Sequence, residues 1–150
     1  WKSLEKELTE ASYDWDTESV PDGDYQVKVI ATDKKSNPVQ TALEDERESE
    51  VFTIDNTSPQ VRILEVKKSQ NERRITAIVS DAVSPVSDAE YSIDAGEWIP
   101  VFPEDGIFDS PEEKVTIVAG ELDPGEHTVV LKATDYFGNI GAGKKTFLVK

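Results

Sequence analysis

The stretch Gly125-Glu-His-Thr-Val-Val-Leu-Lys-Ala-Thr-Asp135 decides the fold class. From His127 to Ala133 apolar and polar residues alternate, which is the period-two pattern of a strand with one buried face. Asp135 and Asn139 then favour a turn, because Asp accepts hydrogen bonds from the loop that follows it and Asn tolerates left-handed geometry. The stretch therefore predicts a strand that ends in an Asp–Asn turn.

Further runs of the same kind lie between Pro59 and Lys150, at residues 60–66, 74–80, 89–93, 97–101, 114–119 and 145–149. A short helix would also fit at 114–119, but the alternation of Val115, Ile117 and Ala119 favours a strand there. Seven short strands in about 90 residues are typical of an immunoglobulin-like or fibronectin type III sandwich. The sequence thus predicts an all-β fold built as an antiparallel β-sandwich.

Residues 20–37 repeat residues 122–139, so that Gly23 and Asp33 each lie 102 positions before Gly125 and Asp135. Nothing in residues 1–58 matches residues 61–93. We expect residues 1–58, the first unit, to be the C-terminal part of a module that carries its last four strands and lacks its first ones. Residues 59–150, the second unit, are expected to form one complete module. Pro59 favours an abrupt change from one unit to the next with almost no linker.

The first unit is expected to need a partner, because half a sandwich buries too little apolar area to fold alone. Its apolar face would consist of Tyr25, Val27, Val29, Ala31, Phe52 and Ile54. We expect this face to be covered by an upstream segment, by a second copy of the chain or by strand exchange between copies. The alternative is that residues 1–17 fold back and close a smaller sandwich.

The chain is strongly acidic, with 31 Asp and Glu against 16 Lys and Arg and a net charge of −15. This charge repels phosphate backbones and anionic lipid heads and leaves no basic stripe, so we expect no binding to nucleic acid and no membrane insertion. No run approaches the roughly 20 apolar residues of a bilayer span. The sequence has no cysteine, which excludes disulfides, thiol chemistry and sulfur metal sites.

Catalytic and cofactor-binding motifs fail on inspection. The single His127 would have to serve as a base, but no Gly-x-Ser-x-Gly element accompanies it and its repeat counterpart is Tyr25. Residues 138–145 approach a phosphate loop, yet Lys145 stands where Ser or Thr is needed and a strand follows in place of a helix. Their glycines are expected in a hairpin turn. We expect a protein without enzymatic activity, catalytic residues or cofactor.

Calcium is the one ligand that the acidic residues bring into question. The stretch Ala31-Thr32-Asp33, together with Asp55, Asn56 and Pro59, resembles the inter-domain calcium elements of cadherins, without their further Asp and Asn ligands. Asp33, Asp55 and Asn56 are therefore the calcium candidates, and solvated acidic faces are the alternative. Because no complete ligand set is visible, added calcium is expected to raise the melting temperature little.

Several phrases resemble the tandem fibronectin type III and immunoglobulin-like modules of bacterial exported proteins. They are residues 20–27, 31–33, 54–59, 91–98, 122–129 and 133–139. The resemblance implies a secreted, periplasmic or cell-surface location. It also implies a non-catalytic tandem that spaces or docks other domains of the parent chain or a protein partner. A carbohydrate-binding module with coplanar exposed rings and a calcium-rigidified adhesion rod are the alternatives.

The alternating faces also predict the core of the second unit. Its members are expected to be Ile75, Val79, Tyr91, Trp98, Val129, Leu131, Ala133 and Phe147.

Overall fold

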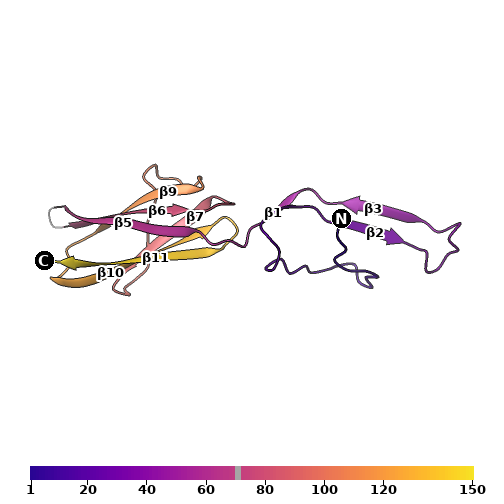
Figure 1. Ribbon diagram of the computed structural model, residues 1–150, viewed down its shortest axis with the longest axis horizontal. Helices are drawn as coiled ribbons and strands as arrows, with labels where there is room; N and C mark the ends of the chain where they lie inside the picture. Colours follow the sequence, from indigo (N-terminus) through magenta and orange to yellow (C-terminus); the bar gives the residue numbers. More distant parts are fainter. Residues whose placement is uncertain (70–71) are drawn as a thin grey trace.

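The computed structural model describes residues 1–69 and 72–150, and the regular elements in these ranges are all strands. The first unit holds β1 (Gly23–Tyr25), β2 (Lys28–Thr32), β3 (Glu44–Glu48) and β4 (Phe52–Ile54). The second unit holds β5 (Gln60–Ser69), β6 (Glu72–Ser80), β7 (Val86–Ile93), β8 (Ile99–Pro100), β9 (Glu112–Ala119), β10 (Gly125–Asp135) and β11 (Ile140–Val149). The two units follow one another along the long axis of the molecule (Figure 1).

The second unit is an antiparallel sandwich, which confirms the predicted fold class. One sheet has the order β5-β6-β9 and the other the order β11-β10-β7-β8. The stretch Gly125–Asp135 forms β10, which pairs with β11 on one side and with β7 on the other. Residues 112–119 are a strand, as their alternation predicts.

The core lies between the two sheets and follows the predicted faces with one exception. Ile75, Val79, Val129, Leu131 and Ala133 are buried, and Tyr91 and Phe147 pack against them while partly exposed. Further buried members are Ala77, Val86, Ala89, Val101, Val115, Ile117 and Ala119. Apart from Val86, which lies opposite the irregularity in β10, and Val101, which follows β8, these residues occupy alternating positions of their strands, so the period-two pattern fills most of the core.

The prediction that Trp98 belongs to the core is wrong. Its side chain is 45% exposed, and Lys132 Nζ lies 4.4 Å from the ring centroid, within the range of a cation–π contact. The edge strand β8 is only two residues long, and Val101, directly after it, turns inward. Trp98 therefore falls on the outer side of the sheet.

A bulge in β5 changes the alternation that its sequence suggests. Ile63 pairs with Ala77 and Glu65 pairs with Thr76, so Leu64 is an extra residue without a direct partner. Beyond the bulge Val66 packs against the core, whereas strict alternation from Val61 would have turned Glu65 inward. The bulge thus keeps a charged side chain out of the core.

The first unit repeats the β10–β11 hairpin in two pieces. Gly23 pairs with Ile54 as Gly125 pairs with Val149, and β2 and β3 continue the hairpin after a break. Residues 1–22 contain no strand. The four strands of this unit thus correspond to only two strands of the second unit, and not to the last four.

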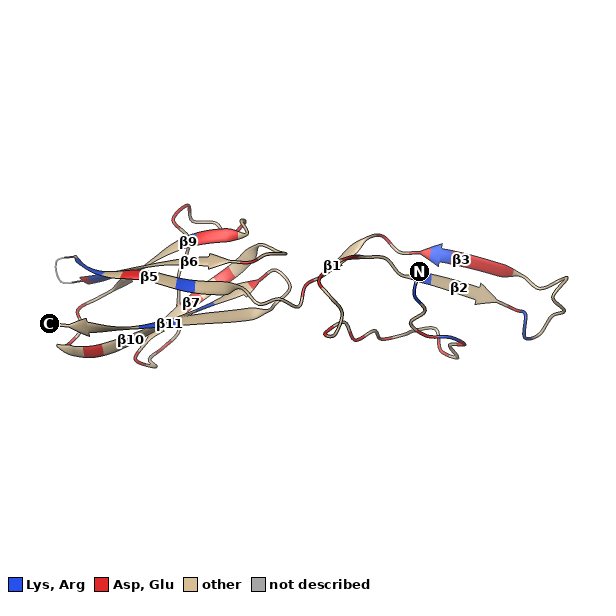
Figure 2. Ribbon diagram, in the orientation of Figure 1, with Lys and Arg blue, Asp and Glu red and all other residues tan. Residues whose placement is uncertain are grey.

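The apolar face of the first unit is covered in part. Residues 1–22 form an irregular segment, and its Trp15 packs edge-on against Tyr25 and Phe52, with ring centroids 6.1 and 6.4 Å away. Val29 is 61% exposed and Ala31 is also exposed. Residues 1–22 therefore close one end of the hairpin and leave β2 open. The strand β3, which pairs with β2 in this open part, consists mainly of acidic residues (Figure 2).

The glycines of residues 138–145 are not all in the turn, contrary to the prediction. Gly138 takes the left-handed φ of 90° in the turn between β10 and β11, but Gly141 and Gly143 lie in β11. A Cβ on Gly141 would stand 1.7 Å from the carbonyl oxygen of Pro59. These two glycines let the start of β11 approach the backbone of the residues that begin the second unit.

Candidate functional site

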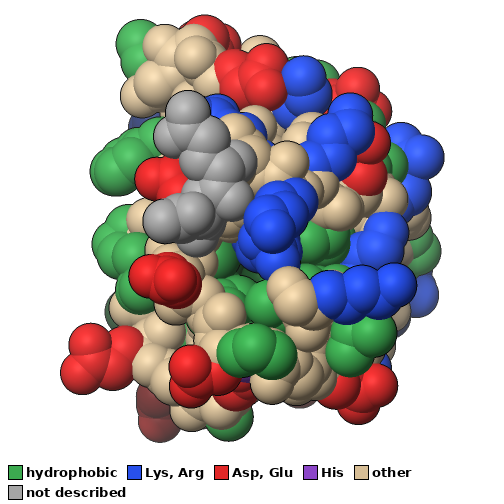
Figure 3. All heavy atoms as spheres, turned by 90° about the vertical axis from the view of Figure 1, so that its left-hand side faces the viewer, with side chains coloured by type: hydrophobic (Ala, Val, Ile, Leu, Met, Phe, Trp, Pro, Cys, Tyr) green, Lys and Arg blue, Asp and Glu red, His purple; other side chains and the backbone are tan. Residues whose placement is uncertain are grey.

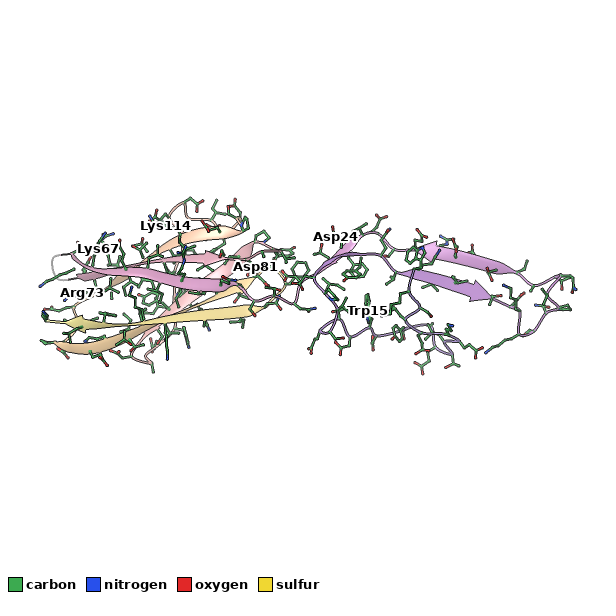
Figure 4. The ribbon with its side chains drawn as sticks, in the orientation of Figure 1. Trp15, Asp24, Lys67, Arg73, Asp81 and Lys114 are labelled. Carbon is green, nitrogen blue, oxygen red and sulfur yellow. The ribbon has the colours of Figure 1, made fainter. Side chains whose placement is uncertain are left out.

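Three aspartates stand where strands end at the junction between the units. Asp55 follows β4, Asp81 follows β6 and Asp135 ends β10. Gln60 pairs with Ser80, which brings the end of β6 to the beginning of β5. The start of β11 lies against Pro59, which brings the β10–β11 turn to the same end. Figure 4 shows Asp81 at the end of the sandwich that faces the first unit.

The three carboxylates form a compact buried cluster, which we call the junction cluster. Each offers one oxygen, and these oxygens all lie within 4.8 Å of one another. The residues are 6%, 7% and 1% exposed in the order Asp55, Asp81, Asp135. Burial of one unpaired carboxylate is already costly, and like charges nearby add to the cost. The junction cluster is therefore costly in free energy unless other groups compensate its charge.

Backbone amides orient each carboxylate of the junction cluster. Asp55 Oδ1 accepts from the amide of Thr57 at 3.1 Å, and Asp81 Oδ1 accepts from the amides of Val83 and Ser84, both at 2.9 Å. The second oxygens, Oδ2 of Asp55 and Oδ2 of Asp81, are buried without a hydrogen-bond partner in residues 1–69 and 72–150. In both residues Oδ1 is thus held by backbone amides, and Oδ2 is left without a hydrogen bond.

Asp135 belongs to the turn that the sequence predicts. Its Oδ1 accepts from the amides of Phe137 and Asn139 at 2.8 and 2.9 Å, and its Oδ2 accepts from Asn139 Nδ2 at 2.8 Å. The same Asn139 amide group donates to the carbonyl oxygen of Asp55 at 2.9 Å. The turn therefore reaches across the junction and holds the residue that follows β4.

The first unit fixes the junction through Asp22. The hydroxyl of Thr57 and the amide of Asn56 both donate to its carboxylate. The Thr57 hydroxyl, followed by the Asn56 amide, lowers the pKa of Asp22 below its ordinary value, because both bonds favour the ionised form. Asn56 and Thr57 are thereby held from the side opposite to the sandwich.

Of the three calcium candidates, the structure places only Asp55 in the junction cluster. Asp33 accepts from the amide of Leu43 at 2.7 Å and from Asn37 Nδ2 at 2.8 Å, in the turn between β2 and β3. The side-chain amide of Asn56 donates to the carbonyls of Thr17 and Val20. Asp33 and Asn56 therefore serve the turn and the irregular segment of the first unit.

Sequence reasoning missed Asp81 altogether and gave Asp135 only its turn. A signal was present, since Asp81 directly follows an alternating run that must pair with the run beginning after Pro59. In an antiparallel pair the end of one strand meets the start of the other. Asp81 could therefore have been placed beside Asp55 from the topology of a sandwich, although not its distance.

His127 has the surroundings of a structural residue. Its Nδ1 lies 2.6 Å from Asp94 Oδ2 and its Nε2 lies 2.8 Å from the carbonyl oxygen of Asp123. A carbonyl and a carboxylate oxygen only accept, so both ring nitrogens donate and the imidazolium is favoured. Neither contact offers a nucleophile. The hydrogen bond to Asp123, followed by that to Asp94, raises the pKa of His127 above its ordinary value.

We expect the single histidine signal in an NMR pH titration to give a pKa above 6.5. The bond from the Thr128 amide, followed by that from His127, lowers the pKa of Asp94. The raised His127 pKa gives stability that is complete below about pH 6.5 and lost as the pH rises through the folded value. The lowered Asp94 pKa gives stability that is lost as the pH falls through its folded value.

Asp94→Asn should move the pKa of His127 back toward 6.5. Asp88→Asn removes the same charge at an exposed position and should leave the histidine titration nearly unchanged. A histidine that titrates at or below 6.5 in the unaltered chain would contradict this assignment of its contacts.

Four exposed aromatic rings, Trp1, Trp98, Tyr136 and Phe137, do not have the arrangement of a coplanar sugar-binding strip. Trp1 and Trp98 each have a lysine Nζ over the ring, at 4.7 and 4.4 Å from the centroid. Tyr136 and Phe137 stand nearly perpendicular, with an interplanar angle of 79°. These rings also come from different parts of the chain, so no specific observation supports the carbohydrate-binding alternative.

The end of the sandwich opposite the junction gathers basic residues (Figure 3), a local cluster that the net charge of the chain does not reveal. Figure 3 shows Lys and Arg side chains across this end, and Figure 4 places Lys67 and Arg73 there. Lys68, Arg73 and Lys150 line a shallow hollow together with Val66 and Phe147. The positive charge of this patch is small compared with the net charge of −15 of the whole chain.

The family model for bacterial Ig-like domains, group 3, matches residues 9–95. The chain belongs to this bacterial Ig-like family. The match crosses the predicted boundary at Ser58 and Pro59, so it supplies the family and not the division into units. A comparison with curated proteins gives no match.

Bacterial Ig-like domains are typically non-catalytic and commonly lie outside the cell or at its surface. In the ranges that the structure describes, no helix is long and apolar enough to cross a membrane. Membership of this family thus supports the expectation of a bacterial Ig-like sandwich module.

Proposed function

We propose that this chain is a non-catalytic spacer in a larger exported bacterial protein, where it holds neighbouring domains or partners at a set distance. The observation that carries this proposal is the path of the chain through the sandwich. The second unit begins at the junction, and Lys150 lies at the opposite end (Figure 1). A module entered at one end and left at the other adds its full length to the parent protein.

The junction supports a fixed and not a loose connection. Only residues 55–59 separate β4 from β5, and Pro59 among them is buried. Asn139 of the second unit donates to Asp55, and Asp22 of the first unit accepts from Asn56 and Thr57. A linker bound from both sides has little freedom to bend.

The repeat supports a tandem arrangement of such modules. Asn37 and Asp33 form the same side-chain bond as Asn139 and Asp135, at 2.8 Å in both turns. In the second unit this turn holds the strand end of the preceding unit. We therefore assign the Asp33–Asn37 turn the same docking task toward another domain of the parent chain. The exposed side of β2 gives such a partner, or a second copy of this chain, an apolar surface to cover.

Spin labels on paired cysteines test the spacer, because the chain has no cysteine of its own. One pair, Val39→Cys and Glu121→Cys, spans the junction, since both positions are exposed and lie in different units. The control pair, Ala82→Cys and Glu121→Cys, uses two exposed positions that both lie in the sandwich. We expect pulsed electron paramagnetic resonance to give distance distributions of similar width for the two pairs of labels.

A distribution several times broader across the junction than within the sandwich would show a flexible tether and overturn the spacer proposal. Light scattering on the same samples separates monomers from associated chains. Distances between labels on different chains appear only in associated samples, and these samples are left out of the comparison.

A further inference from the structure

The junction cluster carries negative charge that nothing else in the described residues balances. None of the ion pairs in residues 1–69 and 72–150 includes Asp55, Asp81 or Asp135. Buried carboxylates are ordinarily paired with a cation, fully hydrogen-bonded or bound to a metal ion. In the described residues no cation pairs with these carboxylates, and their hydrogen bonding is incomplete.

The unsatisfied atoms point to the third case. Oδ2 of Asp55 and Oδ2 of Asp81 are buried without a partner in the described residues, while Oδ1 of each is held by backbone amides. A carboxylate anchored through one oxygen presents the other in a fixed direction. Asp135 is anchored through Oδ1 by the amides of its turn and through Oδ2 by Asn139 Nδ2, and each carboxylate oxygen has a second lone pair for a cation. The cluster is therefore preorganised for a cation among three oxygens.

We propose that the junction cluster binds Ca²⁺ through Asp55, Asp81 and Asp135. The donors are all oxygens, which excludes the nitrogen and sulfur environment that Zn²⁺ prefers. Ca²⁺ accepts irregular sets of six to eight oxygens at about 2.3–2.6 Å, and waters or carbonyls complete such sets. Mg²⁺ requires near-ideal octahedral geometry at about 2.0–2.1 Å, whereas Ca²⁺ tolerates carboxylates whose positions are fixed by strand ends and turns.

The ion would join the two units. Asp55 comes from the strand end of the first unit, whereas Asp81 and Asp135 come from the two sheets of the second. Binding at all three would fix the end of β4 to both sheets of the sandwich at once. Binding itself does not depend on the spacer function; the stiffening of the junction is the part that rests on that proposal.

Calcium titration of the full chain after chelator treatment tests the site. We expect saturable heat in calorimetry and a melting temperature raised by several degrees, which reverses the expectation from sequence alone. Asp81→Asn should weaken binding at least about tenfold and abolish the calcium-dependent shift, because one charged ligand is lost. Without calcium the same variant should melt no lower than the unaltered chain, since repulsion within the cluster is reduced.

Asp33→Asn is the matched control, because Asp33 is the repeat counterpart of Asp135 and has the same Asn partner. It should keep the full calcium shift. Asp135→Asn gives a second test if Asp81→Asn does not fold. Sodium chloride at matched ionic strength controls for general screening of the negative charge.

The proposal fails if calcium releases no saturable heat, if sodium chloride reproduces the shift, or if folded Asp81→Asn and Asp135→Asn retain it. The spin-label pairs keep the two proposals apart. Calcium binding with a broad distance distribution across the junction would uphold the site and reject the spacer, whereas a narrow distribution without calcium binding would do the reverse.

Discussion

Leu131→Ala is expected to lower the free energy of unfolding by about 2–5 kcal/mol. Leu131 is fully buried in the middle of β10, where it pairs with Tyr91 on β7 and with Gly143 on β11. Truncation removes its apolar contacts and leaves a cavity that two flanking strands cannot collapse to fill. Urea unfolding measured by tryptophan fluorescence gives the change from the shift of the midpoint.

Leu148→Ala is the control, since the same side chain is removed from an exposed position of β11. It should change the free energy of unfolding by less than about 1 kcal/mol. Equal midpoints for the two variants would mean that the faces of β10 are exchanged, because a shift of one residue moves every side chain to the other face.

Gly141→Ala is expected to destabilise the chain by about 3 kcal/mol or more, although it adds only a methyl group. The added Cβ would lie 1.7 Å from the carbonyl oxygen and 2.8 Å from the carbonyl carbon of Pro59. Both are backbone atoms, which no rotamer change moves out of the way. Either β11 or the start of β5 must shift, and the junction contacts shift with it.

Gly120→Ala is the matched control in the loop after β9. A Cβ there meets no atom within 4 Å, and the position does not require a left-handed φ. In urea unfolding, the free energy of unfolding of Gly141→Ala should therefore be lower than that of Gly120→Ala by about 3 kcal/mol. If Gly141→Ala were as stable as Gly120→Ala, β11 would not approach Pro59 as closely as the structure places it.

The sequence was sufficient to predict most strands of the second unit and most of its core. Alternation is a local property, and it assigns Val129, Leu131 and Ala133 to one face of β10 without knowledge of any other strand. The same argument failed for Trp98, because large rings also serve as covers on the outer side of a sheet. It failed at Glu65, because a bulge depends on the pairing of β5 with β6 and leaves no clear trace in one strand.

The candidate site was less accessible from sequence. Asp55, Asp81 and Asp135 are separated by 26 and 54 residues along the chain, and only the pairing of strands brings them together. Asp33 was named because Ala31-Thr32-Asp33 resembles an inter-domain calcium element of cadherins, although its turn lies at the other end of the first hairpin. Local motifs named one member of the junction cluster, Asp55, while the meeting of strand ends determines which carboxylates lie together.

The close approach of β11 to β5 has a mechanical consequence. Gly141 lies against Pro59, Gly143 against Val61, and Lys145 Nζ donates to the carbonyl of Leu64, so the two strands run in the same direction. Tension between the junction and Lys150 pulls the start of β5 one way and the end of β11 the other. The two strands would be loaded in shear along their length, so their contacts would have to yield together and not one after another.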